Sequence, residues 1–376
     1  MDASQYICTL EQFQQILDAL KNEGYKTYGP TLQNQVIIYD EIQSAQDLPI
    51  GWMDEQDPGR YRLKPRSDKA YFGYNLGPHS WKKYLFPPRE KLFSVRRQEN
   101  GLTLFQESDT PIEKMAFLGV RACEIQAILI QDKVFQNKID TYTQYKQRRE
   151  QLFILAVNCT RSVNTCFCVS MGAGPEVTES YDLALTEIIN EKEHYFVLQI
   201  GSERGRLLCG PLSLVKAKEN QCQSAKALVK KNEEQMMRRV DNEHVHEMLS
   251  KSWDCKRWDK VAKRCINCAN CTLVCPTCFC STSEDQISMD GDQVDRWQTW
   301  DSCFNLSHSY IHGGPIRESA KSRYRQWLTH KFGTWWDQFG VSGCVGCGRC
   351  IAWCPVGIDV TEELQELKNE IDQDNR

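Results

Sequence analysis

Features of membrane, secreted and nucleic-acid-binding proteins are scarce in this sequence. None of its apolar runs approaches the length of a membrane span, so we expect no transmembrane helix within the 376 residues. Residues 1–10 have neither a basic start nor a hydrophobic core, so we expect no signal peptide. The net charge is −4, whereas a general nucleic-acid-binding protein carries a strong excess of basic residues, so we do not expect nucleic-acid binding.

Motifs of the common catalytic sites are also missing. Gly172 and Gly174 are followed by Pro175, Glu176 and Val177, so the third glycine of a dinucleotide-binding fingerprint is absent. The sequence contains no P-loop, no HExxH motif and no serine nucleophile elbow. It therefore indicates no familiar kind of substrate pocket.

Cysteine, by contrast, is abundant. The chain has 19 cysteines, and most of them lie between Cys255 and Cys354. A secreted disulfide scaffold fits poorly, because such chains are short, whereas this chain is long and its cysteine count is odd. The cysteine density therefore indicates metal binding in a cytoplasmic protein.

The hydrophobic patterns predict a mixed α/β (α+β) domain over residues 1–225. We expect strands at 35–39, 115–120, 152–157 and 195–200, and helices at 10–20 and 121–135. Residues 47–97 are interpreted as loop-rich. Their aromatic segment at 80–88 is expected to pack on the core, with a partner-docking patch as the alternative. Residues 226–263 predict a helical connector, and residues 264–376 predict a two-cluster ferredoxin-like domain with a long insert.

The last domain contains the same cysteine motif twice, C-x2-C-x2-C-x3-C-P, at Cys265–Pro276 and at Cys344–Pro355. This spacing is typical of bacterial ferredoxins, in which three cysteines bind one [4Fe–4S] cluster and the fourth binds the other. The first cluster is therefore assigned to Cys265, Cys268, Cys271 and Cys354. The second is assigned to Cys344, Cys347, Cys350 and Cys275. Zinc fits less well, because structural zinc sites prefer two cysteine pairs separated by a longer loop.

Four cysteines in the α/β domain predict a third [4Fe–4S] cluster: Cys123, Cys159, Cys166 and Cys168. Cys123 and Cys159 directly follow predicted strands, and the carboxyl ends of such strands meet at one edge of a sheet. The glycine-rich turn at 171–175 lies nearby in the sequence. The alternative is that these thiols are buried as small hydrophobic groups.

Three further cysteines, Cys278, Cys280 and Cys303, form a weaker set. These three thiols could be completed as a cluster site by one non-cysteine ligand, either Asp301 or His308. We favour the alternative that the three cysteines only pack beside the ferredoxin clusters and bind no metal. The remaining cysteines show no spacing logic and are interpreted as structural: Cys8, Cys209, Cys222 and Cys255.

The chain shares distinctive stretches with a known family: Gly119 to Cys123, Cys166 to Gly172, Cys275 to Cys280, Trp300 to Phe304, His330 to Phe332 and Cys344 to Asp359. These stretches are similar to the 4Fe-4S dicluster subunits of sulfhydrogenase type. That family includes the β subunits of soluble group 3 [NiFe]-hydrogenases and the iron–sulfur subunits of anaerobic sulfite reductases. The resemblance implies a protein that relays electrons between a catalytic partner and a flavin and NAD(P)-binding subunit.

We therefore expect an electron-transfer subunit of a cytoplasmic hetero-oligomer, with no catalytic residues of its own. The first hypothesis has a [NiFe]-hydrogenase module as the catalytic partner. The second has a sirohaem sulfite reductase as the partner, with this chain as the iron–sulfur subunit of that anaerobic complex. A third hypothesis, of another class, is a stand-alone enzyme that reduces a small substrate at a cluster with an open iron site.

Overall fold

A computed structural model describes most of the chain. The described residues are 5–75, 77–98, 101–106, 112–137 and 141–374. The outer limits of the first and last expected domains, residues 1–4 and 375–376, lie outside these ranges.

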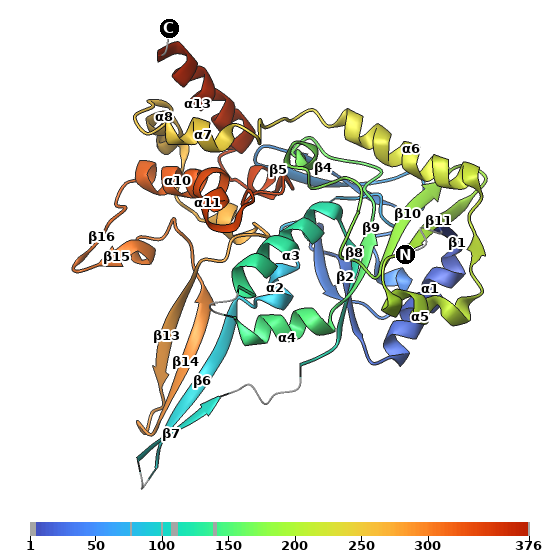
Figure 1. The fold of residues 1–376 in the computed structure, drawn as a ribbon, viewed down its shortest axis with the longest axis horizontal. Coiled ribbons are helices and arrows are strands. Elements are labelled where there is room, and N and C mark those ends of the chain that lie inside the picture. The colour runs from blue at the N-terminus through green and yellow to red at the C-terminus, as the bar shows by residue number, and fades with distance from the viewer. Residues whose placement is uncertain (1–4, 76, 99–100, 107–111, 138–140, 375–376) are drawn as a thin grey trace.

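An eight-stranded mixed sheet forms the centre of the N-terminal half (Figure 1). In spatial order its strands are β12 (Val215–Lys216), β1 (Gln5–Cys8), β11 (His194–Ile200), β10 (Leu183–Ile189), β9 (Phe153–Val157), β8 (Met115–Val120), β2 (Lys26–Gln33) and β3 (Val36–Glu41). The four strands β2, β8, β9 and β10 pair in parallel. Strands β8 and β9 are buried along their whole length, as their continuous apolar sequences require when both faces of a sheet are covered. The expected strands at 115–120 and 152–157 are thus confirmed.

Helices pack on both faces of this sheet. Helix α1 (Leu10–Asn22) begins at a capping box formed by Thr9 and Gln12, and its apolar stripe packs on one face. Helices α3 (Ala122–Phe135) and α4 (Thr143–Gln151) pack on the other face. Helices α5 (Glu203–Cys209) and α6 (Glu219–Gln235) follow the last long strand. The expected helices at 10–20 and 121–135 are therefore confirmed.

The expectation that residues 47–97 are loop-rich is wrong for much of the segment. Strands β4 (Trp52–Asp57) and β5 (Arg60–Pro65) form an antiparallel hairpin. Its turn places Gly59 at φ +71°, a left-handed conformation that glycine adopts without strain. The Pro58-Gly59 pair is a turn signal that the sequence interpretation missed.

The aromatic segment at 80–88 belongs to the core, so the favoured interpretation is confirmed and the docking patch is not. Its short helix α2 (Lys82–Leu85) has Trp81 and Phe86 beside it, each 1% exposed. The Trp81 ring stacks on Tyr39 and on Phe117, with ring centres 3.9 and 4.5 Å away. These rings fill the space between the sheet and the C-terminal half.

A second, four-stranded sheet projects from the body of the molecule (Figure 1). Its antiparallel strands, in spatial order, are β13 (Ser281–Ile287), β14 (Gln293–Trp300), β6 (Arg89–Gln98) and β7 (Gly101–Gln106). β6 and β7 come from the N-terminal half, whereas β13 and β14 come from the insert between Cys275 and Cys344. The insert is therefore joined to the N-terminal half by strand pairing between β6 and β14.

The C-terminal part is mainly helical. Its elements are α7 (Val245–Ser250), α8 (Arg257–Arg264), α9 (Asn270–Leu273), α10 (Ala320–Thr329), a π-helical turn (His330–Thr334), α11 (Trp335–Phe339), α12 (Arg349–Ala352) and α13 (Val360–Asp374), with the small ribbon of β15 (Tyr310–Ile311) and β16 (Gly314–Pro315) before α10. Apolar side chains of these helices form one core, and five of the ferredoxin cysteines pack against it: Cys265, Cys271, Cys344, Cys350 and Cys354. None of the helices in the described part of the chain has the length and apolar character that a membrane crossing requires.

Candidate metal centres

The four thiols of the first ferredoxin set line one apolar pocket: Cys265, Cys268, Cys271 and Cys354. Cys265 follows the last residue of α8, and Cys271 lies in α9. Burial raises the pKa of Cys271 well above its ordinary value, and the neighbouring thiols of Cys265 and Cys354 add to the rise. Cys268 is exposed, so this set reaches the protein surface.

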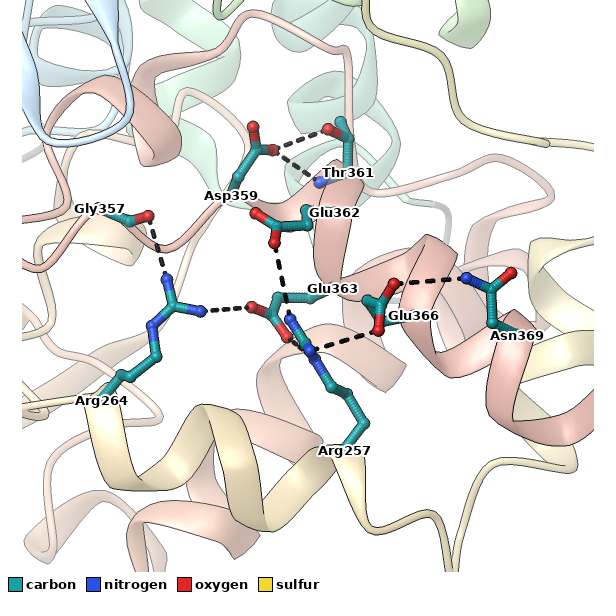
Figure 2. A network of polar contacts seen from close by, with 9 residues as sticks. All are labelled: Arg257, Arg264, Gly357, Asp359, Thr361, Glu362, Glu363, Glu366 and Asn369. Atoms are coloured by element: carbon teal, nitrogen blue, oxygen red, sulfur yellow. Dashed lines mark hydrogen bonds and ion pairs between the residues drawn. The ribbon is translucent and has the colours of Figure 1, made fainter.

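A polar network around the buried Glu363 fixes both ends of the first set (Figure 2). Glu363 of α13 is 1% exposed and accepts hydrogen bonds from Arg257 at 2.6 Å and from Arg264 at 3.2 Å. Arg264 directly precedes Cys265, and it also donates to the carbonyl oxygen of Gly357, three residues after Cys354. The network therefore holds the two chain segments that supply the outer ligands of this set.

The structure also brings together the second ferredoxin set: Cys344, Cys347, Cys350 and Cys275. Burial raises the pKa of Cys344 to about 12, and Lys331 opposes this rise. The Lys331 ammonium lies in the π-helical turn, is buried, and is 3.4 Å from the Cys275 sulfur. The backbone N–H of Gly346 donates to the Cys344 sulfur at 3.4 Å. Such donors and cations stabilise anionic sulfur, so the donor set fits a [4Fe–4S] cluster.

The four thiols expected to form a third set also lie together: Cys123, Cys159, Cys166 and Cys168. Cys123 opens α3 directly after β8, and Cys159 follows β9, so both occupy the carboxyl edge of the parallel strands. Burial raises the pKa of Cys166 to about 12. A side chain at Gly174, in the glycine-rich turn, would come within 3.5 Å of the Cys168 sulfur. The turn therefore covers this thiol closely.

A buried arginine accompanies the third set, as Lys331 accompanies the second. The Arg121 guanidinium is 4.0 Å from the Cys159 sulfur and donates to the carbonyl oxygens of Phe72 and Tyr74. Arg121 is 4% exposed. Because a buried charge requires a partner, this arginine favours an anionic group at the third set.

The second and third sets adjoin through their backbones. The N–H of Phe167 donates to the carbonyl oxygen of Gly346 at 2.9 Å. A side-chain carbon at Gly346 would lie 2.6 Å from the backbone nitrogen of Cys168, and one at Gly348 would lie 2.4 Å from the carbonyl oxygen of Thr165. Only glycine permits this approach of the two loops.

A buried ion pair, which the sequence did not reveal, joins the same two sets. Arg349 lies between Cys347 and Cys350, and its guanidinium pairs with Glu124, the residue after Cys123. Both side chains are no more than 1% exposed, and the Tyr39 hydroxyl also donates to Glu124 at 2.7 Å. The only sequence signal was the position of two charged residues beside predicted ligands.

The weaker set is divided between two contacts. The Cys278 thiol contacts the thiol of Cys275, whereas the Cys280 thiol contacts Cys303 and the His308 imidazole. Contact with Cys303 and His308 lowers the pKa of Cys280 to about 4, and contact with Cys280 raises the pKa of His308 to about 9. The structure therefore places one of the two suggested non-cysteine ligands, His308, against the thiols.

Two of the cysteines interpreted as structural, Cys8 and Cys209, lie in the core of the α/β domain. Burial raises the pKa of each thiol to about 12, as expected for an inert hydrophobic group. Cys255 lies in the core of the helical part, and Cys222 is half-buried in α6.

Comparisons with known proteins agree with this arrangement. Residues 264–358 match the family model of the 4Fe-4S dicluster domain, which spans both ferredoxin sets and the insert. The whole chain is similar to sulfhydrogenase 2 subunit beta of Pyrococcus furiosus, with 28% identity over 362 residues. The aligned region covers 95% of this chain and 96% of the relative. No solved structure shows significant similarity to the chain.

The match at 264–358 and the similarity along nearly the full length confirm the resemblance to sulfhydrogenase-type subunits. The C-terminal region thus matches an iron–sulfur domain of the dicluster type, and the chain is similar over nearly its full length to a sulfhydrogenase β subunit.

Proposed function

We propose that the chain is the electron-transfer subunit of a hydrogenase-type complex. In this proposal the first and second ferredoxin sets each hold one [4Fe–4S] cluster, and the third set holds another. When bound, each cluster accepts one electron and passes it to its neighbour. The observation that carries the proposal is the direct contact between the second and third sets, through Phe167 and Gly346.

Electrostatic interactions between the thiols support an arrangement in which the second set lies between the third and the first. Cys347, a second-set thiol, contributes to raising the pKa of Cys123, Cys166 and Cys168 of the third set. In the same way, Cys271 of the first set contributes to raising the pKa of Cys350 of the second set. The sets therefore follow one another through the molecule in the order third, second, first.

The protein's own side chains exclude water from the inner sets and supply positive charge. Lys331 and Arg121 place buried cations beside the thiols of Cys275 and Cys159. Positive charge at this range stabilises the more negative, reduced state of a cluster. The Arg349–Glu124 pair fixes the second set relative to the third.

Both ends of this arrangement offer places for partners. At one end, the exposed Cys268 lies beside apolar side chains at the surface, with Ile266 60% and Val356 36% exposed. At the other end, a hollow of about 230 Å³ lined by Ala122 and the glycine-rich turn at 172–175 borders the third set. Exposed apolar groups around a redox centre favour docking of another protein.

We assign these ends to a [NiFe]-hydrogenase module and to a flavin and NAD(P)-binding subunit in a cytoplasmic hetero-oligomer. The name of the Pyrococcus furiosus relative supports a hydrogenase complex and a β-subunit role. None of the 19 cysteines, all of which lie in the described part of the chain, forms a disulfide, which favours a reducing compartment.

Affinity purification of the tagged chain under anaerobic conditions tests the proposal. We expect a nickel-containing partner to co-purify and the complex to reduce viologen dyes with hydrogen. In a Cys347→Ser variant, reduction through the flavin subunit should fall at least tenfold, while hydrogen uptake measured directly at the nickel subunit persists. A sirohaem partner, or turnover of a substrate by the isolated chain, would contradict the proposal.

A further inference from the structure

A cluster of thiols outside the three proposed sets lies where the second sheet meets the helical part. Cys278 and Cys280 lie three and five residues after Cys275, and Cys280 precedes the first residue of β13. The N–H of Asp301 donates to the carbonyl oxygen of Cys280 at 2.8 Å, so the chain segment after β14 returns to the same point. Cys303 lies two residues further on, and its thiol contacts that of Cys280.

Two buried lysines face these thiols. Lys82 is 4% exposed, and Lys331 is 3% exposed. The Lys82 ammonium contacts the carbonyl oxygen of Cys278 at 3.0 Å and lies 3.9 Å from the centre of the Trp300 ring. The Lys331 ammonium contacts the hydroxyl of Thr277 and the carbonyl oxygen of Gly343, both at 3.0 Å. These carbonyl and hydroxyl oxygens are neutral, so they do not compensate the charge of the ammonium groups.

Thiols lie beside both ammonium groups. The Lys331 ammonium is 3.4 Å from the Cys275 sulfur, and the Lys82 ammonium contacts the backbone of Cys278, whose thiol contacts that of Cys275. Because buried charges are costly unless paired, the two lysines favour anionic sulfur at Cys278 as well as at Cys275.

A histidine completes the donor set. The Nδ1 atom of His308 is 2.7 Å from a carboxylate oxygen of Asp301, which fixes the ring and leaves Nε2 for a ligand. Asp301 also accepts hydrogen bonds from the Ser302 N–H and from the Asn305 amide, so its oxygens are already engaged. A carboxylate that orients a histidine in this way is the usual partner of a metal-bound imidazole.

We propose that Cys278, Cys280, Cys303 and His308 bind a further iron–sulfur cluster, with the histidine as its one non-cysteine ligand. Asp301 is a positioning residue for His308. A cluster of several irons accommodates this divided donor set, because its ligands are spread over the corners of a larger body.

The test is an iron and sulfide determination on the full chain, purified anaerobically with its partners, combined with EPR of the reduced protein. A Cys280→Ser/Cys303→Ser variant should lose about four iron atoms per chain, the content of one [4Fe–4S] cluster. Cys222→Ser, in α6, is the matched control and should lose none. Unchanged iron in the folded double variant, or zinc in place of the lost iron, would overturn the proposal.

A milder variant keeps the proposal testable if the double variant does not fold. His308→Cys should retain the iron but change one EPR signal and lower the potential of that cluster, because thiolate donates more charge than imidazole. His308→Cys with all signals and potentials unchanged would exclude His308 as a ligand.

In Asp301→Asn, the potential of the same cluster should gain a different pH dependence, because the histidine loses the carboxylate that fixes its proton. These variants leave the third set intact, so Cys166→Ser/Cys168→Ser reports separately on the proposed relay.

Discussion

The two ferredoxin loops have the same cysteine spacing and the same backbone shape, but different surroundings. In the first loop Asn267 and Ala269 have φ angles of +55° and +63°, and in the second loop Gly346 and Gly348 have +65° and +75°. Asn267 and Ala269 are therefore residues held in a left-handed conformation, which costs free energy. Both loops make this turn, whereas only the second loop also requires glycine. The reason is that the third set packs directly on it.

The same contrast holds for the residue before the third cysteine of each loop. Asn270 in the first loop donates one hydrogen bond, to the carbonyl oxygen of Trp353 at 3.1 Å. Arg349 in the second loop is fully buried and pairs with Glu124. The first loop thus lies at the surface, whereas the second loop packs against the segment that begins α3.

The largest effect is expected from breaking the Arg349–Glu124 pair. Arg349→Ala leaves Glu124 as an uncompensated buried charge and should lower the free energy of unfolding by about 3–5 kcal/mol. Asn270→Ala, at the same position of the first loop, should lower it by about 1 kcal/mol. Denaturant unfolding under anaerobic conditions measures both. Equal losses would show that the two loops are equivalent.

Glycine in the second loop provides the next comparison. Gly346→Ala adds a carbon within 2.6 Å of the Cys168 backbone nitrogen, in addition to the strain of a left-handed alanine. We expect a loss of about 3 kcal/mol or more in stability, together with loss of iron. The reciprocal change, Ala269→Gly in the first loop, should alter stability by no more than about 1 kcal/mol. Thermal unfolding and iron content distinguish the two, and a tolerated Gly346→Ala would contradict the close packing.

Lys331 allows a comparison of charge around the two loops. Lys331→Met removes the buried cation beside Cys275, so the reduced state of the second cluster loses stabilisation. A charged hydrogen bond of about 1.5–3 kcal/mol corresponds to a fall in potential of about 60–130 mV. Redox titration followed by EPR should show this fall in the second cluster and no change in the first. Lys321→Met removes a partly exposed lysine that pairs with Asp259, and it should leave all the potentials unchanged.

The smallest expected effect concerns access from solvent. Cys268 is exposed, whereas Cys347 and Cys350 are half-buried. A limited amount of an iron chelator should therefore remove iron from the first cluster before the second. EPR at intervals during chelation checks the order, and simultaneous loss of both signals would argue against it.

Much of the thiol arrangement was predictable from spacing, because the motif itself encodes which cysteines of the two loops lie together. The sequence assigned Cys354 to the first set and Cys275 to the second, and the structure places both there. The third set was predictable because strands β8 and β9 have unmistakable apolar sequences and their ends share an edge. The structure brings its four thiols together, although the presence of iron there remains a proposal.

The parts that escaped prediction depend on contacts between distant residues. The pairing of β6 with β14 joins residues about 200 positions apart, and the polar sequence of β13 has no alternation to suggest a strand. The Glu124–Arg349 pair is likewise invisible in sequence, because each residue alone is an ordinary surface type. The role of Gly346 also becomes apparent only when the loop containing Phe167 is placed against it.

The central claim is that the third set holds a cluster in contact with the second ferredoxin loop. Cys166→Ser/Cys168→Ser in the anaerobically purified chain, followed by iron counting and EPR, tests it most directly. The account predicts a loss of about four iron atoms per chain. The signals of the first and second clusters should persist, and electron transfer through the complex should fall. Unchanged iron content and unchanged electron transfer in the folded variant would contradict the claim.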